Sequence, residues 1–181
     1  VQRADATWKD IRTWLCDALN GGTPNNAQQL AAVRALTDLR LLCANLKFER
    51  NVETWAVAHL SLLQDRMTMI VPLISTVRDA IVALKNAAKF TPELDYLLKN
   101  VAAWVATDTP DQAYTDWIRK KIHDASPKIT KDAAWYEILT VSMTAELERL
   151  VILCESRRET REAVTRCAHG DYSFKPDATP V

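Results

Sequence analysis

Apolar residues recur at spacings of three and four along most of this 181-residue chain. This spacing is typical of amphipathic helices, and no stretch has a pattern that predicts a strand. Turn signals divide the chain into about six helical segments. We therefore expect an all-α fold, an antiparallel bundle with two long helices, over residues 1–168, followed by an irregular tail over 169–181.

The first two predicted helices are separated by Gly21-Gly22. The apolar face expected for the first helix, over about residues 4–20, is Trp8, Ile11, Leu15, Ala18 and Leu19. Thr23 and Pro24 favour the start of a second helix, because threonine caps free N–H groups and proline suits the first helical position. The apolar stripe expected for the second helix is Leu30, Val33, Leu36, Leu39, Cys43 and Leu46.

A continuous apolar seam predicts a long third helix over about residues 49–85. The seam consists of Ala56, Leu60, Leu63, Met67, Ile70, Ile74, Val77, Ile81 and Leu84. Pro72 should bend this helix without ending it, because the seam keeps its phase across the proline. The charge-free runs inside the seam are shorter than the roughly 20 residues that cross a bilayer, so we expect no transmembrane span.

Three more helices are predicted after the seam. Thr91-Pro92 starts the fourth and Thr109-Pro110-Asp111 starts a short fifth. Thr130 is expected to cap the last, which should run over about 131–168. The apolar stripe expected for this last helix is Leu139, Met143, Leu147, Leu150 and Cys154. Beyond Cys154 the stripe fades into charged residues, so we expect this end to bury little.

Composition narrows the class of function. Only three glycines are present, too few for phosphate-cradling loops, dinucleotide fingerprints or many tight hairpins. Lysine plus arginine equals aspartate plus glutamate at 23 each, which argues against nucleic acid as a partner.

The sequence has no arrangement typical of a metal site or a catalytic centre. Four cysteines lack metal-ligand spacing and are interpreted as free, buried thiols of a reducing compartment. His59, His123 and His169 form no paired-ligand motif, and His59 beside the seam is interpreted as a half-buried structural residue. We therefore expect no metal, no cofactor and no catalytic residues.

Six tryptophans are the first unusual feature. They could line a pocket for a planar ligand, but packing in the core or at an interface explains Trp8, Trp104, Trp117 and Trp135, which continue apolar stripes. Trp14 and Trp55 fit those stripes less well and are the candidate ligand residues.

The second unusual feature is a group of four arginines near the end of the chain. Arg157, Arg158, Arg161 and Arg166 alternate with glutamates, and the spacings Glu155–Arg158 and Glu162–Arg166 favour a solvated, salt-bridged helix face. The other interpretation is a basic juxtamembrane segment on the cytoplasmic side, with weak support from basic residues near the first residue.

Two stretches resemble a known family. Residues 36–66 read LTDLRLLCANLKFER and continue into a long helix with His59-Leu60 and Leu62-Leu63. Residues 135–164 read WYEILTVSM and, further on, LERLVILCESRRETREAV, before His169-Gly170-Asp171. Together they resemble the soluble domain between the two transmembrane halves of the fusaric acid resistance family, which includes aromatic carboxylic acid efflux transporters of bacterial inner membranes.

The resemblance implies a segment of a larger membrane protein, at the cytoplasmic face of the inner membrane. It implies proton-coupled export, with the transmembrane halves of the same polypeptide, a homo-oligomer and a periplasmic adaptor protein as partners. The domain would be non-catalytic, bracing or coupling the two halves, with 169–181 leading toward a membrane segment. The matching positions most worth testing are Arg40, Glu49, Arg50, Trp135, Glu137 and Arg158.

Further hypotheses remain open at this point. Arg40 and Glu49 are expected to pair across the turn between the second and third helices. An alternative function is a helical domain that senses a small aromatic acid through Trp14 or Trp55. A helical enzyme would instead require a cleft that joins His59 or His123 to a carboxylate.

Overall fold

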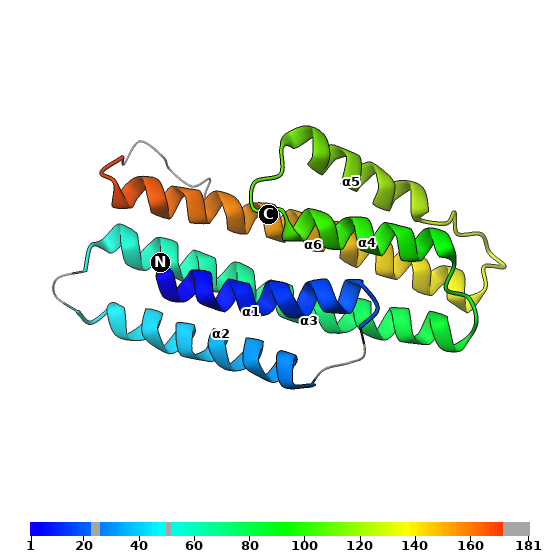
Figure 1. Ribbon diagram of the computed structural model, residues 1–181, viewed down its shortest axis with the longest axis horizontal. Helices are drawn as coiled ribbons and strands as arrows, with labels where there is room; N and C mark the ends of the chain where they lie inside the picture. Colours follow the sequence, from blue (N-terminus) through cyan, green and yellow to red (C-terminus); the bar gives the residue numbers. More distant parts are fainter. Residues whose placement is uncertain (23–25, 50–51, 172–181) are drawn as a thin grey trace.

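The described part of the chain, residues 1–22, 26–49 and 52–171 of a computed structural model, consists of helices and their connections (Figure 1). The helices are α1 (Gln2–Leu19), α2 (Asn26–Leu46), α3 (Thr54–Asn86), α4 (Pro92–Ala106), α5 (Gln112–Ala125) and α6 (Trp135–Ala168). Successive helices run in opposite directions, and no strand occurs in the described residues. The predicted all-α antiparallel bundle is confirmed.

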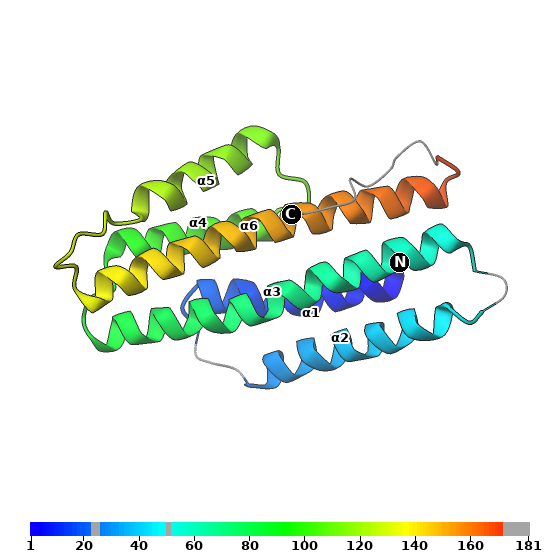
Figure 2. The same ribbon diagram turned by 180° about the vertical axis from the view of Figure 1, so that it is seen from behind.

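The two longest helices, α3 and α6, form the centre of the bundle and lie side by side in opposite directions (Figures 1 and 2). α1 packs against α2, α3 and α4, and α2 packs against α1 and α3. α5 covers the other side, in contact with α4 and α6. Most of the core therefore lies around the α3–α6 pair.

Helix α3 follows the predicted seam. It begins at Thr54 rather than near Glu49, and every seam position except the half-buried Ala56 is buried. It continues through Pro72, and Leu73 and Ile74 directly after the proline are buried, so the phase is kept. The predicted continuation through Pro72 is confirmed, and the bend stays a prediction.

Helix α3 is also the one helix of the described residues that is long and apolar enough to cross a membrane by length and composition. No such segment was expected from the charge-free runs of the sequence. The core helix of a soluble bundle passes the same test, and α3 carries eleven buried residues and packs against α1, α2 and α6.

Side-chain caps start α4 and α5 as the sequence indicates. Thr91 Oγ1 accepts a hydrogen bond from the Leu94 N–H at 3.3 Å, with Pro92 at the first helical position. Asp111 Oδ1 accepts one from the Tyr114 N–H at 2.7 Å. Both contacts satisfy N–H groups that lack a partner within the helix.

The predicted start of the last helix is wrong by about one turn. Residues 130–133 form a turn, in which the Ala133 N–H donates to the Thr130 carbonyl at 3.1 Å, and α6 begins at Trp135. Glu137 Oε2 instead accepts from the Ala134 N–H at 2.8 Å, which is half of a capping box. This contact gives Glu137 a structural role.

Helix α2 buries less than its pattern predicts. Leu39 and Cys43 are buried, but Leu30 and Val33 are exposed, as are Leu41 and Leu42. α2 packs against α1 and α3, and within the described residues no third helix packs on its outer face to a similar extent. The predicted Thr23-Pro24 start lies outside the described residues.

The tryptophans divide differently from the prediction. Trp8 and Trp104 are buried as expected, whereas Trp117 and Trp135 are 37% and 56% exposed, so they do not pack in the core and only packing at an interface stays a prediction for them. Trp14, which fits the stripe less well, is 2% exposed and packs in the core. A helix in contact with three neighbours buries more than one narrow stripe, which explains Trp14 in α1.

The second half of α6 is buried, in contrast to the expected fading of the stripe. Thr160, Ala163, Val164 and Cys167 are all buried, and so is Arg157. The Thr160 hydroxyl has a partner, because it donates to the Ser156 carbonyl at 2.8 Å. The Arg157 guanidinium contacts an aromatic ring, which offsets only part of the cost of its burial.

Candidate functional site

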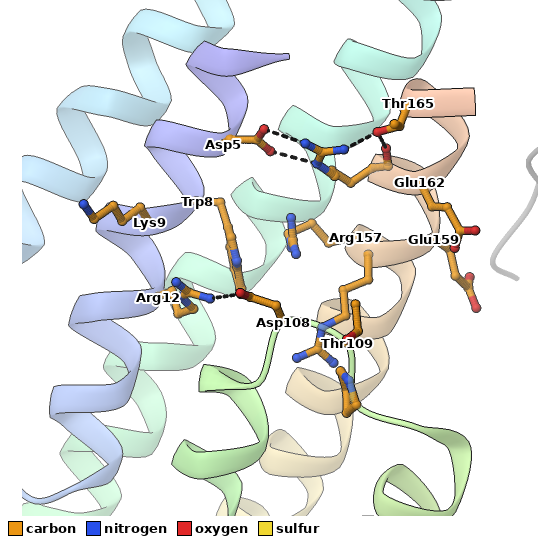
Figure 3. Close-up of a pocket in the computed structure, with 13 residues that line it drawn as sticks. Asp5, Trp8, Lys9, Arg12, Asp108, Thr109, Arg157, Glu159, Glu162 and Thr165 are labelled. Atoms are coloured by element: carbon orange, nitrogen blue, oxygen red, sulfur yellow. Dashed lines mark hydrogen bonds and ion pairs between the residues drawn. The ribbon is translucent and has the colours of Figure 1, made fainter. Parts of the chain in front are cut away.

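A pocket of about 710 Å³ lies between α1 and the second half of α6, and the loop from α4 to α5 closes one end (Figure 3). Both helices pack on α3, which forms the layer behind the pocket. We call it the α1–α6 pocket. It is lined by Asp5, Trp8, Lys9 and Arg12 of α1, Asp108, Thr109 and Pro110 of the loop, and Arg157, Arg158, Glu159, Arg161, Glu162 and Thr165 of α6.

A bidentate ion pair bridges the two helices at one end of the pocket. Arg161 Nε donates to Asp5 Oδ1 at 3.1 Å, and its Nη2 donates to Asp5 Oδ2 at 2.9 Å. Thr165 also accepts from Arg161, which holds the guanidinium in place (Figure 3). The two-point geometry fixes the distance between α1 and α6 more firmly than a single contact would.

Further pairs close the end of the pocket near the loop. Arg12 Nη1 donates to Asp108 Oδ1 at 2.6 Å. Arg158 Nη2 donates to the carbonyls of Trp104 and Thr107 at 3.1 and 2.9 Å, and its guanidinium lies 4.3 Å from the Trp104 ring centroid. Arg158 therefore satisfies carbonyl groups at the end of α4. Burial lowers the pKa of the Arg158 guanidinium from its ordinary value.

Arg157 has a different environment. Its side chain reaches from α6 toward α1, where Cζ lies 4.1 Å from the Trp8 ring centroid (Figure 3). The residue is 8% exposed, and burial lowers the pKa of its guanidinium to about 10, so it remains a cation at neutral pH. Its Nε is buried without a hydrogen-bond partner, and no ion pair joins Arg157 to any carboxylate of the described residues.

The candidate ligand residues from the sequence are not brought together in this pocket. Trp14 is buried in the core, and Trp55 is half-buried, donates to the Glu53 carboxylate and contacts the His59 ring edge-on at 6.2 Å. Neither lines the α1–α6 pocket. The assignment of Trp14 and Trp55 to a ligand stays a prediction.

The expected pair between Arg40 and Glu49 does not form among the described residues. Arg40 is exposed within α2, more than a turn before its last residue Leu46, so it does not flank the turn. Glu49 is exposed after the end of α2, and no ion pair joins the two. Arg50 lies outside the described residues.

The four arginines of the sequence prediction occupy distinct environments. Arg166 and Glu162 pair at 2.5 Å as expected, but Glu155 pairs with Arg119 of α5 instead of with Arg158. Arg157 and Arg158 are not on a solvated face, because they turn into the fold against Trp8 and Trp104. The juxtamembrane interpretation of the group is untested by these contacts.

The cysteines and histidines, the remaining residue types that could bind a metal or take part in catalysis, are placed as structural residues. The four cysteines are free, and burial raises the pKa of the Cys154 thiol to about 12. His59 is buried with Nδ1 2.7 Å from the Trp55 carbonyl, and no hydrogen bond links His59 or His123 to a carboxylate in the part of the chain that the structure describes. Within those residues, no cluster of three or more His, Cys, Asp or Glu side chains could hold a metal ion.

Sequence reasoning missed the partners of these arginines. Asp5 is separated from Arg161 by 156 positions, and Asp108 from Arg12 by 96, so no local pattern identifies either pair. One signal was available: Arg157 continues the buried stripe of α6 at the position three residues after Cys154. An arginine in a stripe position indicates a buried cation that requires a partner.

Comparison with known proteins identifies the family. Neither the curated proteins nor the solved structures contain a match to this chain. The model of the fusaric acid resistance protein family matches residues 1–180, which is nearly the whole chain. The chain therefore belongs to the fusaric acid resistance protein family.

Proposed function

We propose that this chain is the cytoplasmic domain of an inner-membrane efflux transporter, in which it braces or couples the two transmembrane halves and aids oligomer assembly. The family match over residues 1–180 is the observation that carries the proposal, because it supports a transport-related role. The family is one of transporters rather than enzymes, which agrees with a non-catalytic domain.

The α3–α6 pair supports a bracing role. The two helices have 33 and 34 residues, so each spans roughly 50 Å at 1.5 Å per residue. They pack side by side in the centre of the bundle and share an apolar core. A paired unit of this length resists bending more than a single helix, as a mechanical link between two membrane segments requires.

The outer face of α2 supports the proposed assembly. Leu30, Val33, Leu41 and Leu42 are each at least 38% exposed on the outermost helix of one side of the bundle (Figure 2). Exposed apolar side chains gathered on one element are typical of protein interfaces. The partners proposed are the transmembrane halves of the same polypeptide, further copies of it and, for the full-length transporter, a periplasmic adaptor protein.

A linker insertion tests the mechanical part of the proposal in the full-length transporter. A flexible Gly-Ser segment of about six residues inserted at the exposed Gly170 should uncouple α6 from the transmembrane half that it is proposed to brace. Resistance of cells to the exported acid should fall at an unchanged level of transporter in the membrane. The same segment inserted after Lys128, between α5 and α6, is the control and should leave resistance unchanged.

Full resistance with the linker at Gly170 would contradict the bracing role. The side of the membrane is tested separately with Ser142→Cys, at an exposed position of α6. A membrane-impermeant maleimide should label this cysteine only after the inner membrane is opened, and the unsubstituted transporter gives the background from native cysteines. Labelling of intact spheroplasts would contradict a cytoplasmic location.

The alternative of a sensor for aromatic acids is not favoured. It depends on Trp14 or Trp55 lining a pocket, and Trp14 is 2% exposed within the core.

A further inference from the structure

We propose that the α1–α6 pocket binds a small oxyanion group, a carboxylate or a phosphate, at the Arg157 guanidinium. The inference goes beyond the proposed function, because it concerns a ligand held inside the bundle rather than the connection to the membrane. It depends on the local charges and contacts of the pocket, and not on the direction or the substrate of transport.

The first argument is a buried cation that is only partly compensated, by the Trp8 ring and by the electrostatic attraction of Asp5. Arg157 is more than nine-tenths buried, remains charged at neutral pH and pairs with no carboxylate of the described residues. Its contact with the Trp8 ring offsets only part of the cost of removing a guanidinium from water. An anion bound beside Arg157 would offset the remainder.

The second argument is that the acidic side chains of the pocket are already engaged or directed elsewhere. Asp5 is held by Arg161, and Asp108 by Arg12. Glu159 and Glu162 point away from Arg157, toward the outside of α6 (Figure 3). The pocket therefore has five basic and four acidic lining residues; Asp5 attracts Arg157 electrostatically but is bound to Arg161, so no carboxylate of the pocket pairs with Arg157 itself.

The third argument is preorganisation. Arg157 and Arg158 are consecutive on α6, and each guanidinium lies on a tryptophan ring, at 4.1 and 4.3 Å from the centroid. Arg158 keeps one nitrogen, Nη1, buried without a hydrogen-bond partner. A guanidinium fixed against an aromatic face loses little freedom on binding, and its planar N–H groups match two oxygens of a carboxylate or phosphate.

The size of the pocket bears on whether the oxyanion is a free ion or part of a larger molecule. At about 710 Å³ the pocket is within the roughly 300–1,000 Å³ typical of small-molecule sites and exceeds the needs of a free ion. Trp8 and Pro110 add apolar surface beside the arginines. The group could thus be an inorganic phosphate or the charged end of a larger organic anion, and two probes distinguish these sources.

Calorimetric titration of the 181-residue chain tests the proposal. Inorganic phosphate and benzoate are the two probes, each titrated at constant ionic strength against a chloride blank. We expect at least one to bind with a Kd of about 1 mM or tighter, and Arg157→Gln to weaken that binding by about tenfold or more. Arg149→Gln removes an exposed charge from the same helix outside the pocket and should leave the Kd unchanged.

The outcomes separate the alternatives. Binding of benzoate alone assigns an organic carboxylate, and binding of phosphate alone assigns a phosphate group. No binding of either probe at about ten times the expected Kd overturns the proposal, as does equal binding by Arg157→Gln. If Arg157→Gln fails to fold, Arg157→Lys keeps the charge but not the planar fork, and its Kd should still rise by several fold. The linker test at Gly170 and the titration are independent, so a positive linker test would not support oxyanion binding if the titration shows none.

Discussion

The two halves of α6 run along the same neighbour, α3, but they bury different chemistry. The first half, up to Cys154, buries apolar side chains such as Met143, Leu147 and Leu150, with the Thr144 hydroxyl as its one buried polar group. The second half, beyond Cys154, buries the charged Arg157 and the polar Thr160 beside Ala163, Val164 and Cys167, and it faces the α1–α6 pocket. Helical periodicity thus determines which positions of α6 are buried. The residue type at each position determines whether the buried side chain packs in the core or places a charge beside the pocket.

The comparison is sharpest in the reactivity of Cys154, where the two halves meet. Burial raises the pKa of this thiol from 9.0 to about 12, so at pH 8 the thiolate fraction falls by about a thousandfold. We expect no labelling of Cys154 by iodoacetamide in the native chain at pH 8, and rapid labelling in urea. Mass spectrometry of tryptic peptides measures both rates. Because burial raises the pKa of the thiol, Cys154 of the native chain should react only as the pH approaches 12. Fast labelling at pH 8 would contradict the burial of Cys154 away from water.

The largest effect on stability is expected in the first half of α6. Leu147 is fully buried, and Leu147→Ala should lower the free energy of unfolding by about 2–5 kcal/mol through lost burial and a residual cavity. Urea denaturation measures this loss. Glu148→Ala, at the adjacent exposed position, is the matched control and should change stability by less than about 0.5 kcal/mol. Equal effects of the two substitutions would contradict the buried stripe.

In the second half, Arg158 is expected to contribute most. Arg158→Met keeps roughly the same volume but removes the donor to the Thr107 carbonyl, and it leaves the Trp104 carbonyl with the Thr107 N–H alone. The free energy of unfolding should fall by about 1–3 kcal/mol, as for hydrogen bonds from charged groups. Thermal denaturation followed by circular dichroism provides the measurement. An unchanged melting temperature would show that α4 ends equally well without this contact.

The bridge between α1 and α6 should contribute less. Asp5 and Arg161 are 40% and 36% exposed, so solvent screens the pair, and Asp5→Asn should cost about 0.5–1 kcal/mol. The cost should shrink in about 1 M NaCl, because salt screens partly exposed charges. Asp10→Asn, exposed on the same helix, removes an identical charge and is the control. A cost that is independent of salt would contradict an electrostatic bridge.

Arg157 should show the smallest effect on the chain without ligand. Arg157→Met loses the contact with Trp8 but also removes a buried charge that has no carboxylate partner among the described residues. The lost contact lowers stability and the removed charge raises it. The free energy of unfolding should therefore fall by less than about 1 kcal/mol, or increase. Urea denaturation in chloride buffer measures it. A loss of several kcal/mol would mean that Arg157 serves packing as Leu147 does.

Much of the fold could be predicted from local patterns. The seam of α3 and the Thr91 and Asp111 caps depend on residues three or four positions apart, and the structure agrees with them. The start of α6 was predicted too early because Thr130 is a good cap residue, whereas Glu137 anchors the true start at Ala134. A cap residue in the sequence identifies a possible start of a helix. Where two such starts lie close together, their relative stability determines which one the helix uses.

The pocket could not be predicted in the same way. Its contacts join Asp5 to Arg161 and Trp8 to Arg157 across almost the whole chain, and only tertiary packing places them together. The balanced spacing of arginines and glutamates on α6 suggested local pairs instead. Arg158 was predicted to pair with Glu155, but the end of α4 and Arg119 compete for the two groups.

The central claim is that the second half of α6 holds a buried cation ready for an oxyanion, and NMR of the Arg157 Nε–H group tests it most directly. This Nε is buried without an acceptor. During titration with phosphate or benzoate at constant ionic strength, its resonance should move to a saturable end point, while that of the exposed Arg149 stays in place. No shift at Arg157, or a common linear drift of both signals, would contradict the claim.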